Sequence, residues 1–382
     1  MNRRVRVVPS VPVADLTDAL RDALDGTGRA VLPVPAGDDD APPGPDVPAE
    51  VALLVRTSGS TGAPRDVMLT ADALRASAAA THRRLSGPGH WLLALPTGHI
   101  AGLQVVLRSV AAGTEPVELT GPFRADTFRA AAERVPTDLP RYVSLVPTQL
   151  VRVLADPAAT ATLAGFDAVL LGGAAAPGSL VEDARRAGIR VVTTYGMSET
   201  CGGCVYDGVP LDGVDVRIDD DGRIALACPM LAAGYRGDPD LTARTFRTGP
   251  DGTRRLHTSD LGRWADGRLT VLGRADDVLI TGGEKVPPAA VERVVADLPG
   301  VAEVCVVGVP DPQWGQAVTA VLVLHPGAEP PALADVRSTV AGLLGPAAAP
   351  RHLLVLDALP LRGPGKIDRR GVAALAADRL TH

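Results

Sequence analysis

The amino-acid sequence predicts an α/β fold, in which a large layered α/β domain with a small β subdomain is followed by a small α+β domain at the C-terminus. Three observations predict it. The chain has 382 residues, more than one typical core holds, which favours at least two domains. Hydrophobic residues make up 46%, enough for a large core. Apolar strand-like runs alternate with helical stretches in the N-terminal half, as they do in α/β layers.

The first elements follow an acidic, proline-rich segment, residues 36–48. Its prolines exclude a regular element, so we expect a surface loop. Residues 51–55 are an apolar run typical of a strand. Thr70 is suited to cap a helix that continues through an alanine-rich stretch to about residue 85. Residues 91–96 predict a buried strand.

The same alternation continues through the rest of the large domain. Strands are expected at residues 142–146, 168–171 and 190–194, with helices between them at residues 148–154 and 178–187. Shorter strands and turns then predict the β subdomain, with hairpins at the two Asp-Gly turns. These strands are residues 215–218, 223–226 and 268–272, and the turns are residues 220–222 and 266–267.

The C-terminal domain is predicted from two helical and two strand-like patterns. Helices are expected at residues 287–298 and 333–344, and strands at residues 302–310 and 317–324. This mixture is typical of a small α+β domain.

Composition and charge exclude several classes of protein. The net charge of −6 argues against a nucleic-acid partner. The basic start is followed by Pro9, Pro12, Asp15 and Asp18, which interrupt the apolar core of a signal peptide. The sequence has no run of about 18 apolar residues free of charges, Gly and Pro, so we do not expect a helix that spans a membrane. We therefore expect a cytoplasmic enzyme that binds small molecules. We also expect that it can form a homodimer.

Cys201 and Cys204 form a Cys-Gly-Gly-Cys pair that could be half of a zinc site or a redox pair. A zinc site needs about four ligands, and the sequence offers no second pair or nearby histidine spacing to complete it. We therefore expect reduced thiols that line a pocket.

The segment from Thr57 to Arg65 combines hydroxyls, glycines and a cation directly after a strand-like run. Glycines let the backbone approach phosphate oxygens, successive N–H groups bind anions, and hydroxyls add donors. The segment is not a Walker A loop, because the Gly-Lys-Ser/Thr ending is absent. Taken alone, it would be interpreted more readily as a Ser/Gly-rich turn, because Gly and Ser clusters usually mark loops. The candidate phosphate ligands are Thr57, Ser58, Gly59, Ser60, Thr61, Gly62 and Arg65.

Five further segments follow this one in a fixed order, and together they decide between the two interpretations. The six segments resemble the signature motifs of the adenylate-forming superfamily, which contains acyl- and aryl-CoA ligases, adenylation domains of peptide synthetases and firefly luciferases. The later segments resemble its adenine and magnesium motif, ribose motif, hinge, glycine-rich loop and catalytic-lysine motif. They are Tyr195–Thr200, Thr258–Gly262, Gly273–Asp277, Gly282–Val286 and Pro364–Asp368.

The resemblance implies ATP as a substrate. It places Tyr195 on the adenine, Ser198 on the α-phosphate, and Asp260 with Arg274 on the ribose hydroxyls. It implies further nucleotide contacts at Gly172, Gly173, Gly196 and Met197.

The resemblance also implies Mg²⁺, with Glu199 as its ligand, because this hard cation prefers carboxylate and phosphate oxygens. Lys366 would be the catalytic lysine of adenylation. Coenzyme A would meet the loop at Gly282 and Gly283. The hinge at Asp276 implies a mobile C-terminal domain, with domains at residues 1–275 and 276–382.

The acid that is activated is expected to contact His99, Thr200 and Gly202. The short N-terminal region and the sequence after Thr200 resemble the o-succinylbenzoate–CoA ligases of menaquinone biosynthesis. Another aryl- or acyl-CoA ligase, an enzyme that loads a carrier protein, and a catalytically idle nucleotide-binding protein remain alternatives. Arg65 stands where the family usually has Lys, which keeps the charge but changes its geometry.

Overall fold

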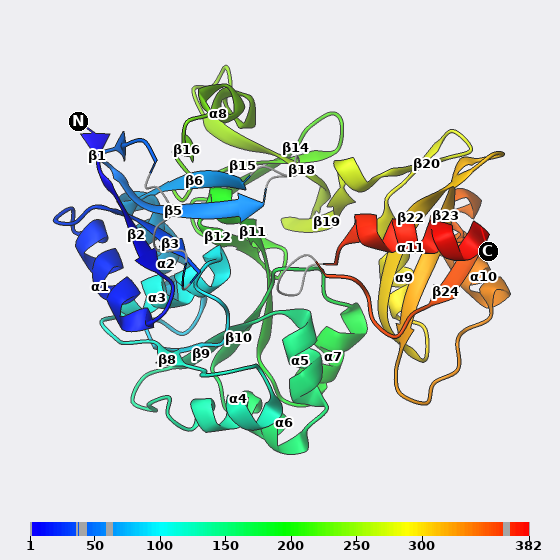
Figure 1. The fold of residues 1–382 in the computed structure, drawn as a ribbon, viewed down its shortest axis with the longest axis horizontal. Coiled ribbons are helices and arrows are strands. Elements are labelled where there is room, and N and C mark those ends of the chain that lie inside the picture. The colour runs from blue at the N-terminus through cyan, green and yellow to red at the C-terminus, as the bar shows by residue number, and fades with distance from the viewer. Residues whose placement is uncertain (1, 36, 38–43, 59–63, 362–366, 382) are drawn as a thin grey trace.

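Two open β-sheets form the frame of the N-terminal part of the molecule (Figure 1). The computed structural model describes residues 2–35, 37, 44–58, 64–361 and 367–381. The five-stranded sheet has the order β16-β6-β5-β3-β2, and the seven-stranded sheet has the order β13-β12-β11-β10-β9-β7-β8. The strands of the first are β2 (Val5–Pro9), β3 (Ala30–Val34), β5 (Val51–Ser58), β6 (Pro64–Thr70) and β16 (Gly234–Tyr235). The strands of the second are β7 (His90–Leu93), β8 (Val117–Glu118), β9 (Arg141–Leu145), β10 (Ala168–Leu171), β11 (Val191–Met197), β12 (Gly202–Tyr206) and β13 (Val209–Pro210).

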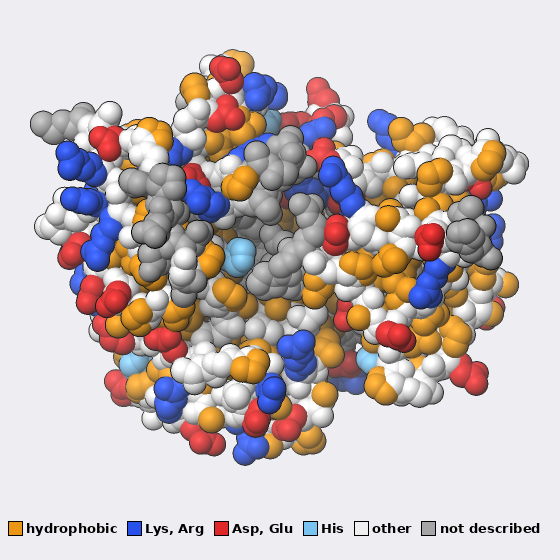
Figure 2. All heavy atoms as spheres, viewed as in Figure 1, with side chains coloured by type: hydrophobic (Ala, Val, Ile, Leu, Met, Phe, Trp, Pro, Cys, Tyr) orange, Lys and Arg blue, Asp and Glu red, His pale blue; other side chains and the backbone are white. Residues whose placement is uncertain are grey.

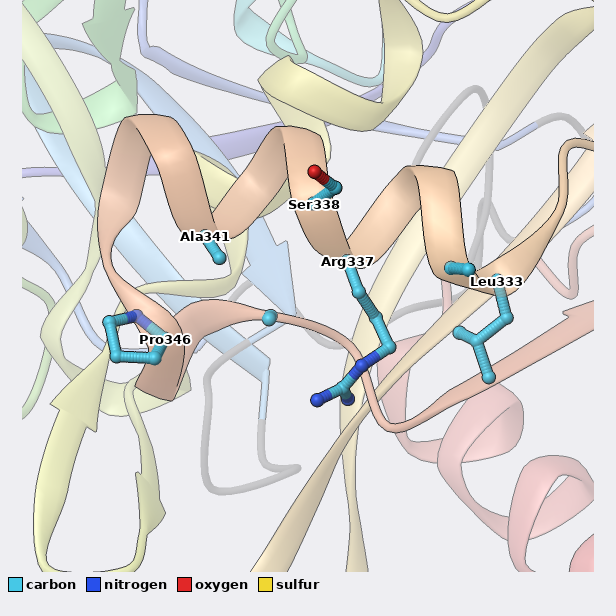
Figure 3. A pocket seen from close by; sticks show the side chains of 7 residues that line it. Leu333, Arg337, Ser338, Ala341 and Pro346 are labelled. Carbon is cyan, nitrogen blue, oxygen red and sulfur yellow. The ribbon is translucent and has the colours of Figure 1, made fainter.

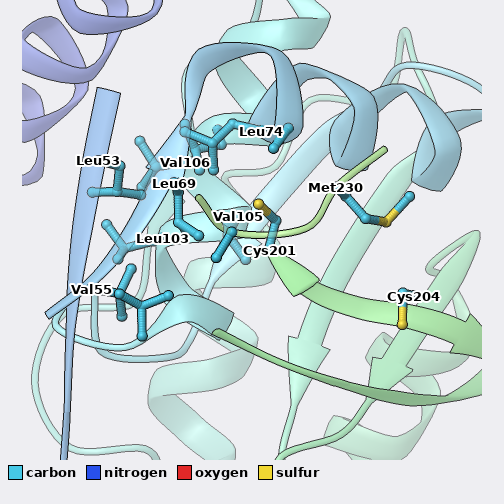
Figure 4. Close-up of a cluster of buried hydrophobic side chains, with 14 of the residues drawn as sticks. Leu53, Val55, Leu69, Leu74, Leu103, Val105, Val106, Cys201, Cys204 and Met230 are labelled. Carbon is cyan, nitrogen blue, oxygen red and sulfur yellow. The ribbon is translucent and has the colours of Figure 1, made fainter. Parts of the chain in front are cut away.

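Three helices pack between these sheets and share one core with both. They are α1 (Val13–Leu24), α2 (Ala71–Arg84) and α3 (Ile100–Ala112). Leu53 and Leu69 of the five-stranded sheet meet Leu74 of α2 and Leu103 of α3 in this core (Figure 4). All four side chains are fully or almost fully buried, and each contributes about 1.5–3 kcal/mol by leaving water.

Four shorter helices cover the outer face of the seven-stranded sheet. They form a second core that includes Phe128, Leu150 and Leu163 from the helices and Val143 and Val169 from the strands. The helices are α4 (Ala125–Ala132), α5 (Pro147–Leu154), α6 (Pro157–Ala164) and α7 (Gly178–Arg186). Helices therefore lie on both faces of this sheet, as predicted for a layered α/β domain.

A separate antiparallel sheet forms the β subdomain. Its order is β14-β15-β18-β17, and β19 pairs with β18. Asp266 and Gly267 connect β18 to β19 with positive φ angles of 51° and 70°, the conformation that a tight hairpin turn requires. The elements are β14 (Asp215–Ile218), β15 (Arg223–Ala227), α8 (Pro239–Thr245), β17 (Phe246–Thr248), β18 (Arg254–Ala265) and β19 (Arg268–Arg274).

The C-terminal part has its own sheet, which lies beside the N-terminal part in Figure 1. Its strand order is β21-β20-β23-β22, with β24 paired to β23. Helices α9 and α10 pack on one face and α11 on the other, so the sheet has two cores of its own. The elements are β20 (Leu279–Thr281), β21 (Glu284–Val286), α9 (Pro288–Ala296), β22 (Val301–Asp311), β23 (Gly315–Leu324), α10 (Leu333–Leu344), β24 (His352–Val355) and α11 (Arg369–Thr381).

Most of the expected elements are confirmed. Strand β10 and helix α10 have the bounds that the sequence predicts. Thr70 caps α2, since its hydroxyl accepts a hydrogen bond from the backbone N–H of Ala73 at 3.1 Å. The short 3-10 helix Ala275–Asp277 separates the β subdomain from the C-terminal sheet.

Two expectations need correction. Strand β7 ends at Leu93 instead of residue 96, because the carbonyl of Ala94 accepts a hydrogen bond from the Gln149 side chain at 2.9 Å and not from a strand. Within the expected loop 36–48, Val47 and Pro48 form the short strand β4, which pairs with β1 (Asn2–Arg3). Burial of the Val47 side chain explains why the chain is held there. Residues 36 and 38–43 lie outside the described part.

Candidate active site

A tyrosine, an aspartate and an arginine from three different strands form a hydrogen-bonded group. The hydroxyl of Tyr195, on β11, donates to Oδ2 of Asp260 at 2.8 Å. Nη1 of Arg274 lies 3.4 Å from Oδ1 of the same carboxylate. Asp260 and Arg274 are directly paired across β18 and β19. The fold thus brings together the three residues expected at adenine and ribose, although Tyr195 and Asp260 are 65 positions apart in the sequence.

The electrostatics of this group favour a ligand that donates hydrogen bonds. Burial raises the pKa of Asp260, although the hydrogen bond from Tyr195 and the charge of Arg274 act in the opposite direction. Burial, together with the charge of Asp260, also raises the pKa of Tyr195, so the phenol stays neutral and donates. A carboxylate that has lost water but keeps acceptor capacity is suited to the two hydroxyls of a ribose.

The turn after β11 is held by very close backbone packing. A side chain on Gly196 would put its Cβ 2.0 Å from the carbonyl oxygen of Gly202, so glycine is required there. Thr200 is fully buried and donates its hydroxyl to the same carbonyl at 2.7 Å. Ser198 is also buried, and Met197 ends β11. Because the side chains of Ser198 and Thr200 are buried, a ligand at this turn would meet mainly backbone atoms.

Glu199 lies in the 3-10 helix Ser198–Thr200, which connects β11 to β12. Its Oε1 accepts a hydrogen bond from the hydroxyl of Tyr235, on β16, at 2.8 Å. Its backbone carbonyl accepts from the N–H of Ala232 at 2.9 Å. The segment 232–235 therefore contacts both the backbone and the side chain of this glutamate.

A polar surface pocket of about 520 Å³ lies where β6 begins. Thr57 and Arg65 are opposite each other on β5 and β6, and the hydroxyl of Thr57 donates to the carbonyl of Arg65 at 3.3 Å. Ser58 ends β5. The expected phosphate ligands Gly59, Ser60, Thr61 and Gly62 lie outside the described residues. The pocket is lined by Arg56, Pro64, Arg65, Asp66, Tyr235, Arg236 and Asp238.

The residues expected to contact the acid meet at the start of α3. His99 is the residue directly before this helix. Gly202 lies against Ile100 and Gln104, since a Cβ on Gly202 would be 3.2 Å from Cγ of Gln104. Gly172, which follows β10, leaves room for the Thr194 hydroxyl of β11, and Gly173 has a positive φ of 81°. These contacts to the acid stay predictions.

The residues expected to act on coenzyme A and in adenylation belong to the C-terminal part. Gly282 and Gly283 connect β20 to β21 with φ angles of 57° and 84°. A Cβ on Gly282 would be 2.7 Å from the Trp314 ring, and the Gly282 N–H donates to the Trp314 carbonyl at 2.9 Å. Glycine is therefore required at this position. Lys366 lies outside the described residues.

A second pocket, of about 500 Å³, lies beside α10 (Figure 3). Its one charged lining residue, Arg337, donates from Nη1 to the Pro350 carbonyl at 2.8 Å. The pocket is lined by Leu333, Ala334, Arg337, Ser338, Ala341, Pro346 and Ala349. Since none of these residues comes from the segments described above, we do not assign this pocket to catalysis.

Metal-binding groups of three or more His, Cys, Asp or Glu are absent from the described residues. Cys201 and Cys204 are free thiols, as expected, but both are fully buried in the core between the sheets and do not line a pocket (Figure 4). Among the described helices, none is long and apolar enough to cross a membrane. Basic and acidic side chains are interspersed on the face in Figure 2, without a broad field of one sign.

Comparison with protein families identifies the chain. A model described as AMP-binding enzyme matches residues 4–234, and the AMP-binding enzyme C-terminal domain matches residues 290–366. The chain belongs to the AMP-binding enzyme family. It is an AMP-forming ligase that forms acyl-adenylates and binds ATP, in agreement with the expected motifs.

Relatives within the AMP-binding enzyme family are similar over nearly the whole chain. A probable 2-succinylbenzoate–CoA ligase of Mycobacterium tuberculosis is 47% identical over 96% of both chains. The o-succinylbenzoate CoA synthetase of Bacillus subtilis, solved with the acyl-adenylate OSB-AMP, is 28% identical with a TM-score of 0.71, covering 93% of this chain and 80% of that one. ATP-bound MatB of Rhodopseudomonas palustris is 26% identical with a TM-score of 0.76, covering 98% and 80%.

Sequence reasoning missed one residue of this site, Tyr235. It is a single aromatic residue, 36 positions away from the glutamate that it contacts. No spacing rule links two such residues, so only the three-dimensional structure reveals the contact.

Proposed function

We propose that this enzyme activates o-succinylbenzoate with ATP and then transfers the acyl group to coenzyme A, a step of menaquinone biosynthesis. The observation that carries the proposal is the 47% identity, over 96% of both chains, to a probable 2-succinylbenzoate–CoA ligase. The hydrogen-bonded group of Tyr195, Asp260 and Arg274 supports the nucleotide half. Together they favour a CoA ligase over an idle nucleotide-binding protein.

The proposed chemistry has two steps. An oxygen of the substrate carboxylate attacks the α-phosphorus of ATP, and the bond from that phosphorus to the bridging oxygen breaks, so that pyrophosphate leaves. The thiolate of coenzyme A then attacks the acyl carbon, and AMP leaves with the electron pair of the carbon–oxygen bond. The protein's task is to position the reactants and to stabilise charge on the phosphoryl oxygens.

Residues of this chain would take separate parts in these steps. Asp260 and Arg274 would hold the ribose, Tyr195 the adenine and Ser198 the α-phosphate. Arg65, with its neighbours Thr57 and Ser58, would contact the outer phosphates as the phosphate-loop cation. Lys366 would stabilise charge during adenylation.

Mg²⁺ fits the residues present at Glu199. A lone carboxylate beside a phosphate-binding segment, without a cluster of protein ligands among the described residues, suits a cation that takes most of its ligands from phosphate and water. When bound, Mg²⁺ would neutralise phosphate charge. Coenzyme A would pass the loop at Gly282 and Gly283, whose lack of side chains leaves the backbone open to a narrow thiol arm.

We further propose that the domains meet at residue 275, with residues 1–275 carrying the nucleotide and residues 276–382 acting as a mobile domain. The composition of the C-terminal sheet supports this boundary, because all of its strands come from residues after Asp277. The short 3-10 helix Ala275–Asp277 would serve as the hinge.

Pyrophosphate release across a panel of acids tests the proposed function. We expect o-succinylbenzoate to be preferred to benzoate and to long fatty acids. A fatty acid would leave polar groups of the acid pocket unpaired, at about 1–3 kcal/mol each. Thioester should form only when coenzyme A is added. Efficient turnover of fatty acids without turnover of o-succinylbenzoate would contradict the proposal.

A further inference from the structure

Tyr235 has a rigid ring and a hydroxyl that reaches the glutamate of the active site. The residue is 7% exposed. Its ring packs against Phe246 with centroids 5.9 Å apart and the planes tilted by 52°. From this position the hydroxyl donates to Oε1 of Glu199 at 2.8 Å. Packing of the buried ring therefore fixes the position of the hydroxyl.

The backbone around Tyr235 is fixed as firmly as the ring. Its N–H donates to Oγ1 of Thr242 at 2.9 Å, and the residue pairs with Val67 across β16 and β6. Gly234 has no room for a side chain, since its Cβ would be 2.4 Å from Cγ2 of Thr242. The donor is thus pre-organised before any ligand binds.

Glu199, in contrast, lies in a single 3-10 turn and has several rotatable side-chain bonds. A hydrogen bond to a charged group is worth about 1.5–3 kcal/mol, enough to favour one orientation of the carboxylate over the others. Tyr235 also lines the polar pocket that contains Arg65. Tyr235 therefore lies next to the pocket in which the phosphates of ATP are expected.

We propose that Tyr235 is a positioning residue, which holds the carboxylate of Glu199 in the orientation that binds Mg²⁺ together with ATP. The inference rests on the proposed function, in which Glu199 is the metal ligand. Residues that orient a metal ligand through a hydrogen bond contribute about 10- to 100-fold to metal affinity. A purely structural clasp would contribute to stability and not to metal affinity.

Metal binding without turnover separates the two roles. Tyr235→Phe keeps the ring and its contact with Phe246 but removes the donor. Binding of Mn²⁺, a spectroscopic substitute for Mg²⁺, is measured by electron paramagnetic resonance with a non-hydrolysable ATP analogue and no acid. We expect about 10-fold weaker Mn²⁺ binding, with metal-free AMP binding unchanged.

Tyr142→Phe is the matched control. Tyr142 is also buried, and its hydroxyl donates to the Gly87 carbonyl at 2.9 Å and accepts from the Ser86 N–H at 3.1 Å, all within another part of the fold. Its loss should lower the melting temperature without changing Mn²⁺ affinity. Unchanged Mn²⁺ affinity in Tyr235→Phe as well would overturn the inference.

A double-mutant cycle with Glu199→Gln tests whether Tyr235 acts through Glu199. We expect Tyr235→Phe to have no further effect on Mn²⁺ affinity in the Glu199→Gln background. The same 10-fold loss in both backgrounds would contradict the positioning role. If Glu199→Gln alone left Mn²⁺ affinity unchanged, the metal assignment of the proposed function would fail, which is a different result from the failure of Tyr235 alone.

Discussion

Asp260 is the residue on which the proposed nucleotide site depends most clearly. Its carboxylate is desolvated, which raises its pKa, and it is held between the Tyr195 hydroxyl and the Arg274 guanidinium. Both partners lie on paired strands, with Arg274 directly opposite Asp260 and Tyr195 opposite Val205. A ligand with two adjacent hydroxyls would replace the water that burial has removed.

Asp260→Ala is therefore expected to weaken binding of AMP by about 10- to 100-fold, since it removes hydrogen bonds to a charged group. Isothermal titration with AMP, without acid, measures this directly. The control is Asp219→Ala, because Asp219 accepts from Nδ1 of His257 at 2.9 Å on the same sheet. AMP affinity equal to that of the parent protein would show that the ribose is bound elsewhere.

Some of the candidate site could be predicted from the sequence, and the part that could not has a physical reason. Tyr195, Glu199 and Asp260 lie in short motifs, because each needs particular neighbours for its turn or strand. Tyr235 has no such neighbours. Its proposed role comes from a hydrogen bond to a residue 36 positions away, and a local sequence pattern does not encode such a contact.

At the scale of elements, helices α2 and α3 form an unusual polar seam inside the core. Arg108 of α3 is buried, with its guanidinium 5.0 Å from the centroid of the Trp91 ring and Nη2 3.3 Å from the Tyr206 hydroxyl. His82 of α2 faces this cation. Burial, and then the charge of Arg108, lowers the pKa of His82 to about 4. The histidine is therefore neutral in the folded protein.

This shift predicts a loss of stability in mild acid. An unfolded histidine takes up a proton near pH 6.5, whereas His82 in the fold does so only near pH 4. The unfolded state binds more protons between these values, so the free energy of unfolding falls as the pH decreases from about 6.5 to about 4. Thermal melts across this range should show the fall, and His82→Gln should reduce its slope.

Ser77→Ala is the control for that series, because Ser77 is also buried in α2 but its side chain does not titrate. The account predicts that this variant keeps the slope of the parent protein. A slope that is unchanged in His82→Gln would contradict the assignment of the effect to His82.

The elements that the sequence predicts well have a clear hydrophobic pattern. Helix α10 buries one face, with Val336 and Val340 in the core, whereas strand β10 is a short continuous apolar run that is buried throughout. Helix α3 was not predicted, because it lies between two sheets and is buried along all of Gly102–Ser109, which removes the helical period of polar residues. Helix α1, which follows Pro12, was also not predicted.

At the scale of the whole molecule, two carboxylates mark the connection between the parts. Asp276 lies 3.2 Å from Nη2 of Arg274, in the N-terminal part. Asp277 lies 3.5 Å from Nε of Arg369, at the start of α11 in the C-terminal part. Asp276 and Asp277 are thus paired with different parts of the molecule, as a hinge at the proposed position would require.

Lys366→Ala tests the proposed rotation about this hinge. A lysine that serves only adenylation should be needed in the first step and not in the second. We expect the single-turnover rate of adenylation to fall by about 10²- to 10³-fold, as on removal of one transition-state contact. Thioester formation from pre-made acyl-adenylate and coenzyme A should keep its rate. Equal losses in both steps for Lys366→Ala would contradict alternation between two orientations.

The fate of the substrate's carboxylate oxygen tests the central claim most directly. With ¹⁸O in the reacting carboxylate of o-succinylbenzoate, an acyl-adenylate must pass one labelled oxygen to AMP when coenzyme A displaces it. We predict one ¹⁸O atom in each AMP and none in pyrophosphate, measured by mass spectrometry after complete turnover. Label in inorganic phosphate, or AMP without label, would contradict the account.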